Sequence, residues 1–177
     1  QNLEWEATHS LSPAESTNEY VPLFVGISQD GDGARHDQIL SGLTPTPSLM
    51  AVGATWNVSQ SEQVGTVLGS ELSAIGFNLI VGPSLDVVES PNPSALSDLG
   101  TSVFGGDPFW VAKMGGAFIK GIHEGSKNRM VVITKHFPGR GDSDRQLGEE
   151  VATVRKSLEA LKQVELFPFF AVASATD

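Results

Sequence analysis

Short apolar runs alternate with helical patterns of apolar residues along the chain. Residues 21–27 form an apolar run that stops at the polar, glycine-rich segment 28–33. Similar runs at 77–81 and 130–134 are followed at once by a Gly-Pro pair or by charged residues. Continuous apolar runs of this length, bounded by turn residues, are typical of strands buried on both faces. The pattern therefore predicts three buried β-strands.

Apolar residues at helical spacing predict three helices, over 59–75, 108–124 and 149–165. For the first, Asn57 or Ser59 is a suitable N-cap, and Gly76 is a suitable stop. Asp107 followed by Pro108 is a typical start for the second, because an acidic cap and a proline in the first turn both favour helix initiation.

The predicted order alternates strands and helices, which favours parallel strands joined by right-handed crossovers. Residues 40–55, with prolines and small side chains, predict an irregular crossing segment. Residues 1–20 are polar and patternless, so we expect a mobile lead-in before one domain at 21–177. Sites in such sheets form at the carboxyl ends of the strands. Because all three polar clusters follow strand ends, we expect them to converge on one face.

Composition narrows the possible partners. The chain of 177 residues is 40% hydrophobic and carries a formal charge of −10, which disfavours binding to nucleic acid. It has no cysteine, which excludes disulfides and thiolate chemistry. No apolar run approaches the roughly 20 residues of a membrane helix, and no signal-peptide pattern opens the chain, so we expect no membrane partner.

Lys135 and His136 stand side by side at the end of the third predicted strand, before a Pro-Gly turn. Two hydrogen-bonding side chains at a strand mouth can bind a ligand. Alternatively, His136 ties down the turn and Lys135 lies on the surface. The spacing alone gives these interpretations equal weight.

Asp142 and Asp144 come next, with Arg140 and Arg145 beside them. A carboxyl group here can serve as a general acid or base, because glycoside cleavage needs a proton at the leaving oxygen. Nearby arginines, however, lower the pKa of an aspartate, the wrong direction for a general acid. Charge alone therefore favours a solvated loop in which the arginines pair the acids.

Two further aspartates follow predicted strand ends. Asp30, with Asp32, stands in a segment that lacks the final Glu of a calcium-binding EF-hand, so a glycine-rich turn is the better interpretation. Asp86 either binds substrate hydroxyls or braces the long loop after it, with equal weight. The histidines have no metal-ligand spacing, and His123 fits the last turn of a helix, where it favours the dipole. We expect no metal and no cofactor.

Several ordered segments resemble glycoside hydrolase family 3. KHFPGRGDS resembles the family's KHFPGHGDT signature, and PLFVGISQDGDG resembles its PLFIAIDQEGG. TPTPSLMAVGATWN, GFNLIVGPSLDV and VFGGDPFWVA are similar to TP-PSAMALGAT, GINLNFAPVLDV and SFGSDPEVVA, and LEALKQVELFPF is similar to L-x-x-L-x-x-VEL-PF. The match runs from about residue 21 to 172, and the bacterial β-N-acetylglucosaminidase-like subgroup is the most similar. The resemblance implies about half of a (β/α)8 barrel, an α/β fold that binds carbohydrate and hydrolyses O-glycosidic bonds without a cofactor.

The resemblance also implies roles for individual residues. The family's Lys-His pair binds sugar hydroxyls, which carries over to Lys135 and His136. The aspartate of PVLDV lies near the site and corresponds to Asp86, and we expect Asp86 and Asp30 to bind substrate on the same face. Asp144 is the carboxyl group nearest to the position of the family's acid-base pair, which makes it the candidate catalytic residue.

Other positions depart from the family. Ser28 replaces the acidic residue that grips the nonreducing sugar, Ser102 replaces an arginine, and the segment after the signature has no histidine. The family's nucleophilic aspartate is expected on a strand beyond Asp177. The resemblance therefore implies that this chain alone is inactive.

Two other readings stay open. One is a noncatalytic carbohydrate-binding or structural half-barrel, and the other is an unrelated doubly wound binding domain. Half a barrel leaves apolar strands uncovered, so we expect either a homodimer or the missing half of the same barrel to cover them.

Overall fold

The computed structural model describes residues 23–31, 37–90, 99–141, 143, 151 and 153–175. Its elements in chain order are β1 (Gly26–Ser28), α2 (Leu49–Ala54), α3 (Val58–Ala74), β2 (Leu79–Ser84), α4 (Pro108–Gly125), β3 (Val131–Lys135), α5 (Leu158–Gln163) and α6 (Phe167–Ala173). The alternation of strands and crossover helices is that of a partial α/β barrel, as predicted. The predicted lead-in at 1–20 lies outside the described residues.

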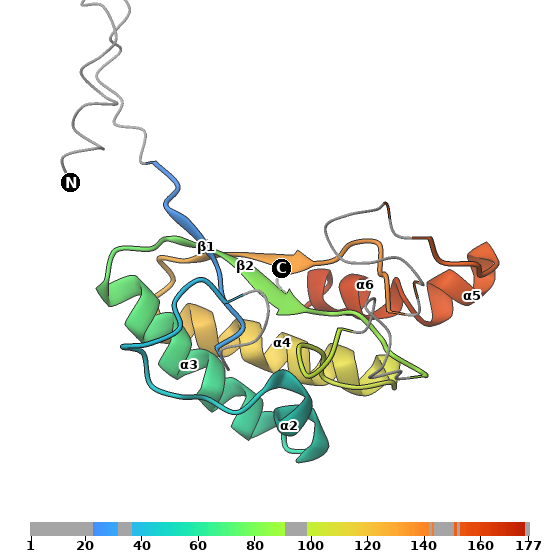
Figure 1. Cartoon of the computed structure of the whole chain (residues 1–177), viewed down its shortest axis with the longest axis horizontal. Coiled ribbons are helices and arrows are strands. Elements are labelled where there is room, and N and C mark those ends of the chain that lie inside the picture. Colours follow the sequence, from blue (N-terminus) through green and yellow to red (C-terminus); the bar gives the residue numbers. More distant parts are fainter. Residues whose placement is uncertain are drawn as a thin grey trace, which may run out of the picture.

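The strands form a parallel sheet in the order β1-β2-β3, which confirms the predicted strand direction. Gly26, Leu79 and Val131 are partners in one row across the sheet. Helices α3, α4 and α6 lie together below the sheet in Figure 1, so the helices cover the same face of the strands.

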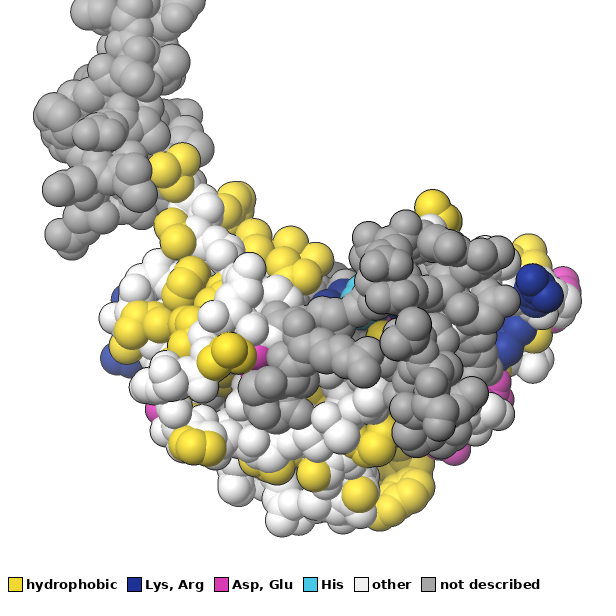
Figure 2. All heavy atoms as spheres, in the orientation of Figure 1, with side chains coloured by type: hydrophobic (Ala, Val, Ile, Leu, Met, Phe, Trp, Pro, Cys, Tyr) yellow, Lys and Arg dark blue, Asp and Glu magenta, His cyan; other side chains and the backbone are white. Residues whose placement is uncertain are grey.

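The two faces of the sheet differ in exposure. Ile27 and Ile80, one row further along, are buried in the main hydrophobic core. On β3, Val131 is 45% exposed and Ile133 is 46% exposed. Figure 2 shows hydrophobic side chains gathered at the surface where the described chain enters β1 and beside the strands. One face of the sheet therefore packs on helices, while the other is open.

Helices α3 and α4 pack closely because each carries glycines four residues apart. These are Gly65 and Gly69 on α3, and Gly121 and Gly125 on α4. A Cβ atom built at Gly121 would lie 2.0 Å from the carbonyl oxygen of Glu62, and each of the other three would also meet backbone of the opposite helix. Only hydrogen side chains allow the two backbones to approach this closely. The two helices form a layer that packs against one face of the sheet.

The first two predicted helices start and stop close to their sequence signals. Asn57 caps α3 by accepting a hydrogen bond from the Ser59 amide at 3.0 Å. Gly76, just beyond α3, adopts a positive φ of 103°, which suits glycine at a helix end. Asp107 caps α4 by accepting from the amide of Trp110. Among the described residues, no helix combines the length and apolar character needed to cross a bilayer.

Three predicted elements were wrong in extent or type. Of the described residues in the predicted helix 149–165, only α5 is helical, and Val151 is 89% exposed; α6 follows beyond the predicted end. The N-cap Ser157 starts α5, and Pro168 stands in the first turn of α6. These local signals, rather than the apolar periodicity, set where the two helices begin. The segment 40–55 contains α2, and β2 runs through the Gly-Pro pair that was expected to end it.

Candidate functional site

An ion pair joins the ends of the two outer strands. Asp30 follows β1, and Lys135 is the last residue of β3. The Lys135 Nζ atom lies 3.2 Å from Asp30 Oδ2, and it donates to the hydroxyl of Ser28 at 3.4 Å. The Asp30 side chain is fully buried, and that of Lys135 is 9% exposed. The pair therefore holds an ammonium group at the carboxyl ends of the strands.

A second pair lies at the end of the central strand. The Nδ1 atom of His136 lies 2.6 Å from Asp86 Oδ2, and the His136 amide donates to the same oxygen at 3.3 Å. Ser84 donates its hydroxyl to Oδ2 at 2.8 Å, and the Arg140 amide donates to Oδ1 at 2.7 Å. Asp86 is fully buried, whereas the His136 side chain is 30% exposed. The network fixes the turn after β3 to the end of β2.

Asp86 and Arg140 bring opposite charges together within the protein. Arg140 is buried rather than solvated, which corrects the expectation that this arginine belongs to an exposed loop. Burial lowers the pKa of the Arg140 guanidinium, while the Asp86 charge acts in the opposite direction. Asp142, Asp144 and Arg145, the other charges of that predicted loop, lie outside the described residues.

The turn after β3 also packs against a buried glutamate, Glu165, which the sequence analysis did not select. Gly139 has a φ of 118°, and a Cβ atom there would lie 2.5 Å from the Cβ of Glu165. Glu165 is fully buried, and its Oε1 atom accepts from Lys156 Nζ at 2.7 Å. Lys156 also donates to Glu89, beyond β2. The sequence signal that could have indicated this role is a glutamate within the apolar run VELFPF. A charged residue in such a run is expected to be buried with a partner.

The structure brings together four of the residues that the sequence selected, namely Asp30, Asp86, Lys135 and His136. They share one end of the sheet, as the strand order predicts. Asp86 is bonded to the turn after β3, a role that the sequence analysis did not weigh, since it considered only the long loop that follows Asp86 in sequence. Direct contact of Asp86 with a sugar stays a prediction. Asp144 falls outside the described residues.

Two of the positions that depart from the family motif are described, Ser28 beside this cluster and Ser102 in a buried turn, while most of the segment after the signature lies outside the described residues. The Ser28 hydroxyl donates a hydrogen bond to the Val81 carbonyl and accepts one from the Lys135 ammonium. Ser102 is buried in a turn, where its amide donates to the Leu99 carbonyl. Within the described part of the chain, no three His, Cys, Asp or Glu side chains gather closely enough to hold a metal ion.

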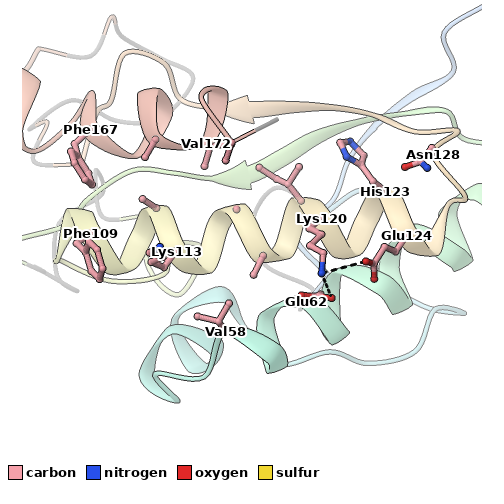
Figure 3. A pocket seen from close by; sticks show the side chains of 16 residues that line it. Val58, Glu62, Phe109, Lys113, Lys120, His123, Glu124, Asn128, Phe167 and Val172 are labelled. Atoms are coloured by element: carbon pink, nitrogen blue, oxygen red, sulfur yellow. Dashed lines mark hydrogen bonds and ion pairs between the residues drawn. The ribbon is translucent and has the colours of Figure 1, made fainter. Parts of the chain in front are cut away.

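A groove of about 770 Å³ runs along α4 and is lined by residues of α3, α4 and α6. Figure 3 shows Phe109 and Phe167 at one end, and Lys120 beside Glu62 and Glu124 at the other. The hydrogen bond to Glu62 is the main cause that raises the pKa of Lys120. His123, in the last turn of α4 as predicted, also lines this groove. None of the four clustered residues lines it, so the groove is separate from the candidate site.

Comparison with known proteins identifies relatives over most of the chain. Residues 4–176 match the family described as Glycosyl hydrolase family 3 N terminal domain. A β-hexosaminidase of Pseudomonas aeruginosa (strain LESB58) is 30% identical over 152 residues, which make up 85% of this chain and 44% of that protein. A β-hexosaminidase of Neisseria meningitidis serogroup C is 34% identical over 154 residues, or 81% of this chain and 40% of that protein. The chain thus spans less than half the length of these curated relatives.

Solved structures give the same result. A glycoside hydrolase family 3 β-N-acetylglucosaminidase from Paenibacillus is similar with a TM-score of 0.78 and 31% identity, over 88% of this chain and 28% of that one. NagZ from Neisseria gonorrhoeae, solved in complex with N-trifluoroacetyl-D-glucosamine, is similar with a TM-score of 0.75 and 27% identity, over 90% of this chain and 46% of that one.

Proposed function

The chain belongs to glycoside hydrolase family 3, and from this membership we propose that its strand-end cluster is the sugar-binding part of a glycosidase site for β-N-acetylglucosaminides or related β-glucosides. The observation that carries the proposal is the pairing of Lys135 with Asp30 and of His136 with Asp86 at one end of a parallel sheet. Ligands of barrel proteins bind at this end of the strands. The relatives named β-hexosaminidase and β-N-acetylglucosaminidase support the choice of sugar.

The charges of the cluster suit a neutral ligand. Lys135 lies next to the Asp30 carboxylate, and the Asp86 charge acts on the Arg140 guanidinium, so a carboxylate accompanies each of these two cations. An uncharged sugar presents hydroxyl groups that both donate and accept hydrogen bonds. Lys135 supplies fixed donors for such groups, and its burial means that little side-chain entropy is lost when a ligand binds.

We also propose that the chain of 177 residues does not turn over glycosides by itself. Hydrolysis with retention needs one carboxylate free to attack and a second acid to protonate the leaving group. Asp30 is buried beside Lys135, and Asp86 is buried with both oxygens accepting hydrogen bonds, so neither is presented as a nucleophile. The coverage of less than half of each relative supports the same proposal.

Two measurements test these proposals. Titration of the chain with N-acetylglucosamine, followed by NMR, should shift the His136 signals, and His136→Ala should abolish the shifts of neighbouring residues. His123→Ala is the matched control, because His123 lies on the separate groove. Absence of binding in the folded wild type overturns the sugar site. Hydrolysis of an aryl β-N-acetylglucosaminide clearly above buffer, lost in Asp144→Asn, overturns the proposed inactivity.

The open sheet face favours a second candidate, a noncatalytic half-barrel that self-associates. Val131 and Ile133 expose nearly half of their surface on a parallel sheet, a type normally covered on both faces. We propose that a second copy covers this face in solutions of the isolated chain, because the exposed residues are apolar and uncharged and so suit a two-fold contact. Sedimentation equilibrium at micromolar concentration should show a dimer. A stable monomer overturns this candidate.

A further inference from the structure

A small pocket with two tryptophans in its wall lies beside the starts of α3 and α4. Its volume is about 320 Å³. Trp56 precedes Asn57, the N-cap of α3, and Trp110 lies in the first turn of α4. The two rings meet edge to face, with their centroids 4.8 Å apart. The rest of the wall includes Met50 and Gly53 of α2, and Val88, Phe104, Gly106 and Asp107 between β2 and α4.

The pocket lies at the same end of the sheet as the strand-end cluster. Helices that connect parallel strands begin at the carboxyl ends of those strands. In Figure 1 the strand arrows point toward the side on which α3 and α4 begin. Val88, in the pocket wall, is two residues beyond Asp86, so their Cα atoms lie within about 7 Å of each other. The pocket is therefore close to the strand-end cluster without sharing its four residues.

Trp56 is unusual in both its exposure and its backbone. The residue is 59% exposed, so packing on Trp110 covers only part of the ring. Its φ is 54°, in the left-handed region, where a bulky residue is strained. Strained residues gather at ligand sites, and exposed apolar surface marks binding sites. Both features point to a ligand that contacts the ring.

Close backbone contacts fix the wall of the pocket. A Cβ atom at Gly53 would lie 1.8 Å from the Phe104 carbonyl oxygen, and one at Gly106 would lie 2.5 Å from that of Val88. The Val88 amide also donates to the Gly105 carbonyl at 3.1 Å. These contacts join α2, the segment after β2 and the start of α4. The pocket is thus formed before a ligand enters, and binding needs little further ordering of the chain.

We propose that this pocket is a second sugar-binding site, which holds one neutral sugar ring against the exposed part of Trp56. The C–H groups on one face of a pyranose can pack on an aromatic surface, while its hydroxyl groups at the edge form hydrogen bonds. Tryptophan suits this contact because its ring is large, rigid and amphipathic. The choice of a sugar rests on the proposed function, whereas the pocket itself follows from the contacts above.

The polar groups and the size of the pocket fit such a ligand. Asp107 is exposed, and its carboxylate accepts from the Trp110 amide at 3.1 Å with lone pairs left for sugar hydroxyls. The described residues of the wall include no lysine, arginine or histidine that would attract an anion. The volume is at the lower end of the range of about 300–1,000 Å³ for small-molecule sites, which suits a single ring.

Titration of the folded, ¹⁵N-labelled chain with N-acetylglucosamine tests the proposal. The indole N–H signals of Trp56 and Trp110 and the amide signal of Gly106 should shift and saturate together. Aromatic walls also bind methylated ammonium ions, so a parallel titration uses tetramethylammonium chloride, which should leave these signals in place. Signals that do not respond to the sugar overturn the proposal. A stronger response to tetramethylammonium than to the sugar overturns it too.

Trp56→Gly removes the ring and suits the positive φ, so we expect this variant to fold. Sugar binding at the pocket, followed on Trp110 and Gly106, should weaken by about tenfold or more, because a large buried contact is lost. Phe170→Ala is the matched control, since Phe170 is an exposed ring on α6 that does not line the pocket. Undiminished binding by folded Trp56→Gly, or an equal loss in Phe170→Ala, overturns the proposal. Should Trp56→Gly not fold, the wild-type titrations decide alone.

The same titration separates this site from the proposed function. His136→Ala should leave the shifts of Trp110 and Gly106 unchanged, and Trp56→Gly should leave those of His136 unchanged. Shifts confined to His136 and its neighbours refute the second site alone. Shifts confined to the pocket refute the sugar site at the strand-end cluster alone.

Discussion

The close packing of α3 on α4 predicts opposite effects for two glycine-to-alanine changes in the same helix. Gly121 and Gly116 both lie inside α4, where alanine is intrinsically better than glycine by about 1 kcal/mol. A Cβ atom at Gly121 would lie 2.0 Å from the Glu62 carbonyl oxygen, whereas one at Gly116 would meet only a methyl group of Val172 at 3.9 Å. The environments differ, while the chemistry of the change is the same.

The expected magnitudes follow from these distances. For Gly121→Ala, the helices must separate by about 1.4 Å to restore the 3.4 Å at which ordinary contact begins. The obstacle is backbone, which has no rotamer to change, so the cost lies at or above the upper end of the roughly 1–3 kcal/mol typical of overpacking. After the gain in helix propensity, we expect Gly121→Ala to lower the free energy of unfolding by about 2 kcal/mol. Gly116→Ala should raise it by about 0.5–1 kcal/mol.

Urea unfolding followed by circular dichroism measures both variants against the wild type. The midpoints should move in opposite directions with the slope unchanged, because the surface exposed on unfolding is nearly constant. The melting temperature should fall by about 4–8 °C for Gly121→Ala. The reasoning is refuted if Gly121→Ala is as stable as the wild type, or if both variants move in the same direction.

Three further outcomes are expected. Lys135→Met should destabilise the chain by about 3 kcal/mol because it removes the ammonium paired with the buried Asp30 carboxylate. Combining it with Asp30→Asn should recover part of the loss, and equal stability of the single and double variants in urea would contradict this. Asn57→Ala should cost about 1 kcal/mol in the same assay by removing the cap of α3, and no loss would mean that the cap contributes nothing. Ile133→Lys should convert the proposed dimer to a monomer in sedimentation equilibrium, and a persistent dimer would place the interface elsewhere.

The positions of strand ends and helix starts were largely predictable, because they depend on signals local in sequence. Asn57 and Asp107 cap their helices through amides two and three residues away. The polar residues after each apolar run also indicated which end of the sheet carries the site. Local signals were weaker for 149–165. Val151 and Val154 have helical apolar spacing, but neither lies in a helix, because α5 begins only at Leu158.

The pairing of the site residues was not predictable from local pattern. Asp86 and His136 are 50 residues apart, and Lys135 is 105 residues from Asp30, so only the register of β1, β2 and β3 brings them into contact. Burial also matters. Asp86 is inaccessible to solvent, so its carboxylate bonds to groups of the turn after β3 instead of to water.

The sequence by itself determined the alternation of parallel strands and helices, the family, and the end of the sheet at which polar side chains gather. The sequence shows the glycines of α3 and α4, but not that they lie at a helix–helix contact. Nothing local in the sequence indicates which helix packs against them. Only the tertiary structure decided that Lys135 pairs with Asp30, that His136 is oriented by Asp86, and that Glu165 supports the turn between them. These contacts join segments distant in sequence, and a buried charge takes whichever partner the packing of the whole fold places within reach.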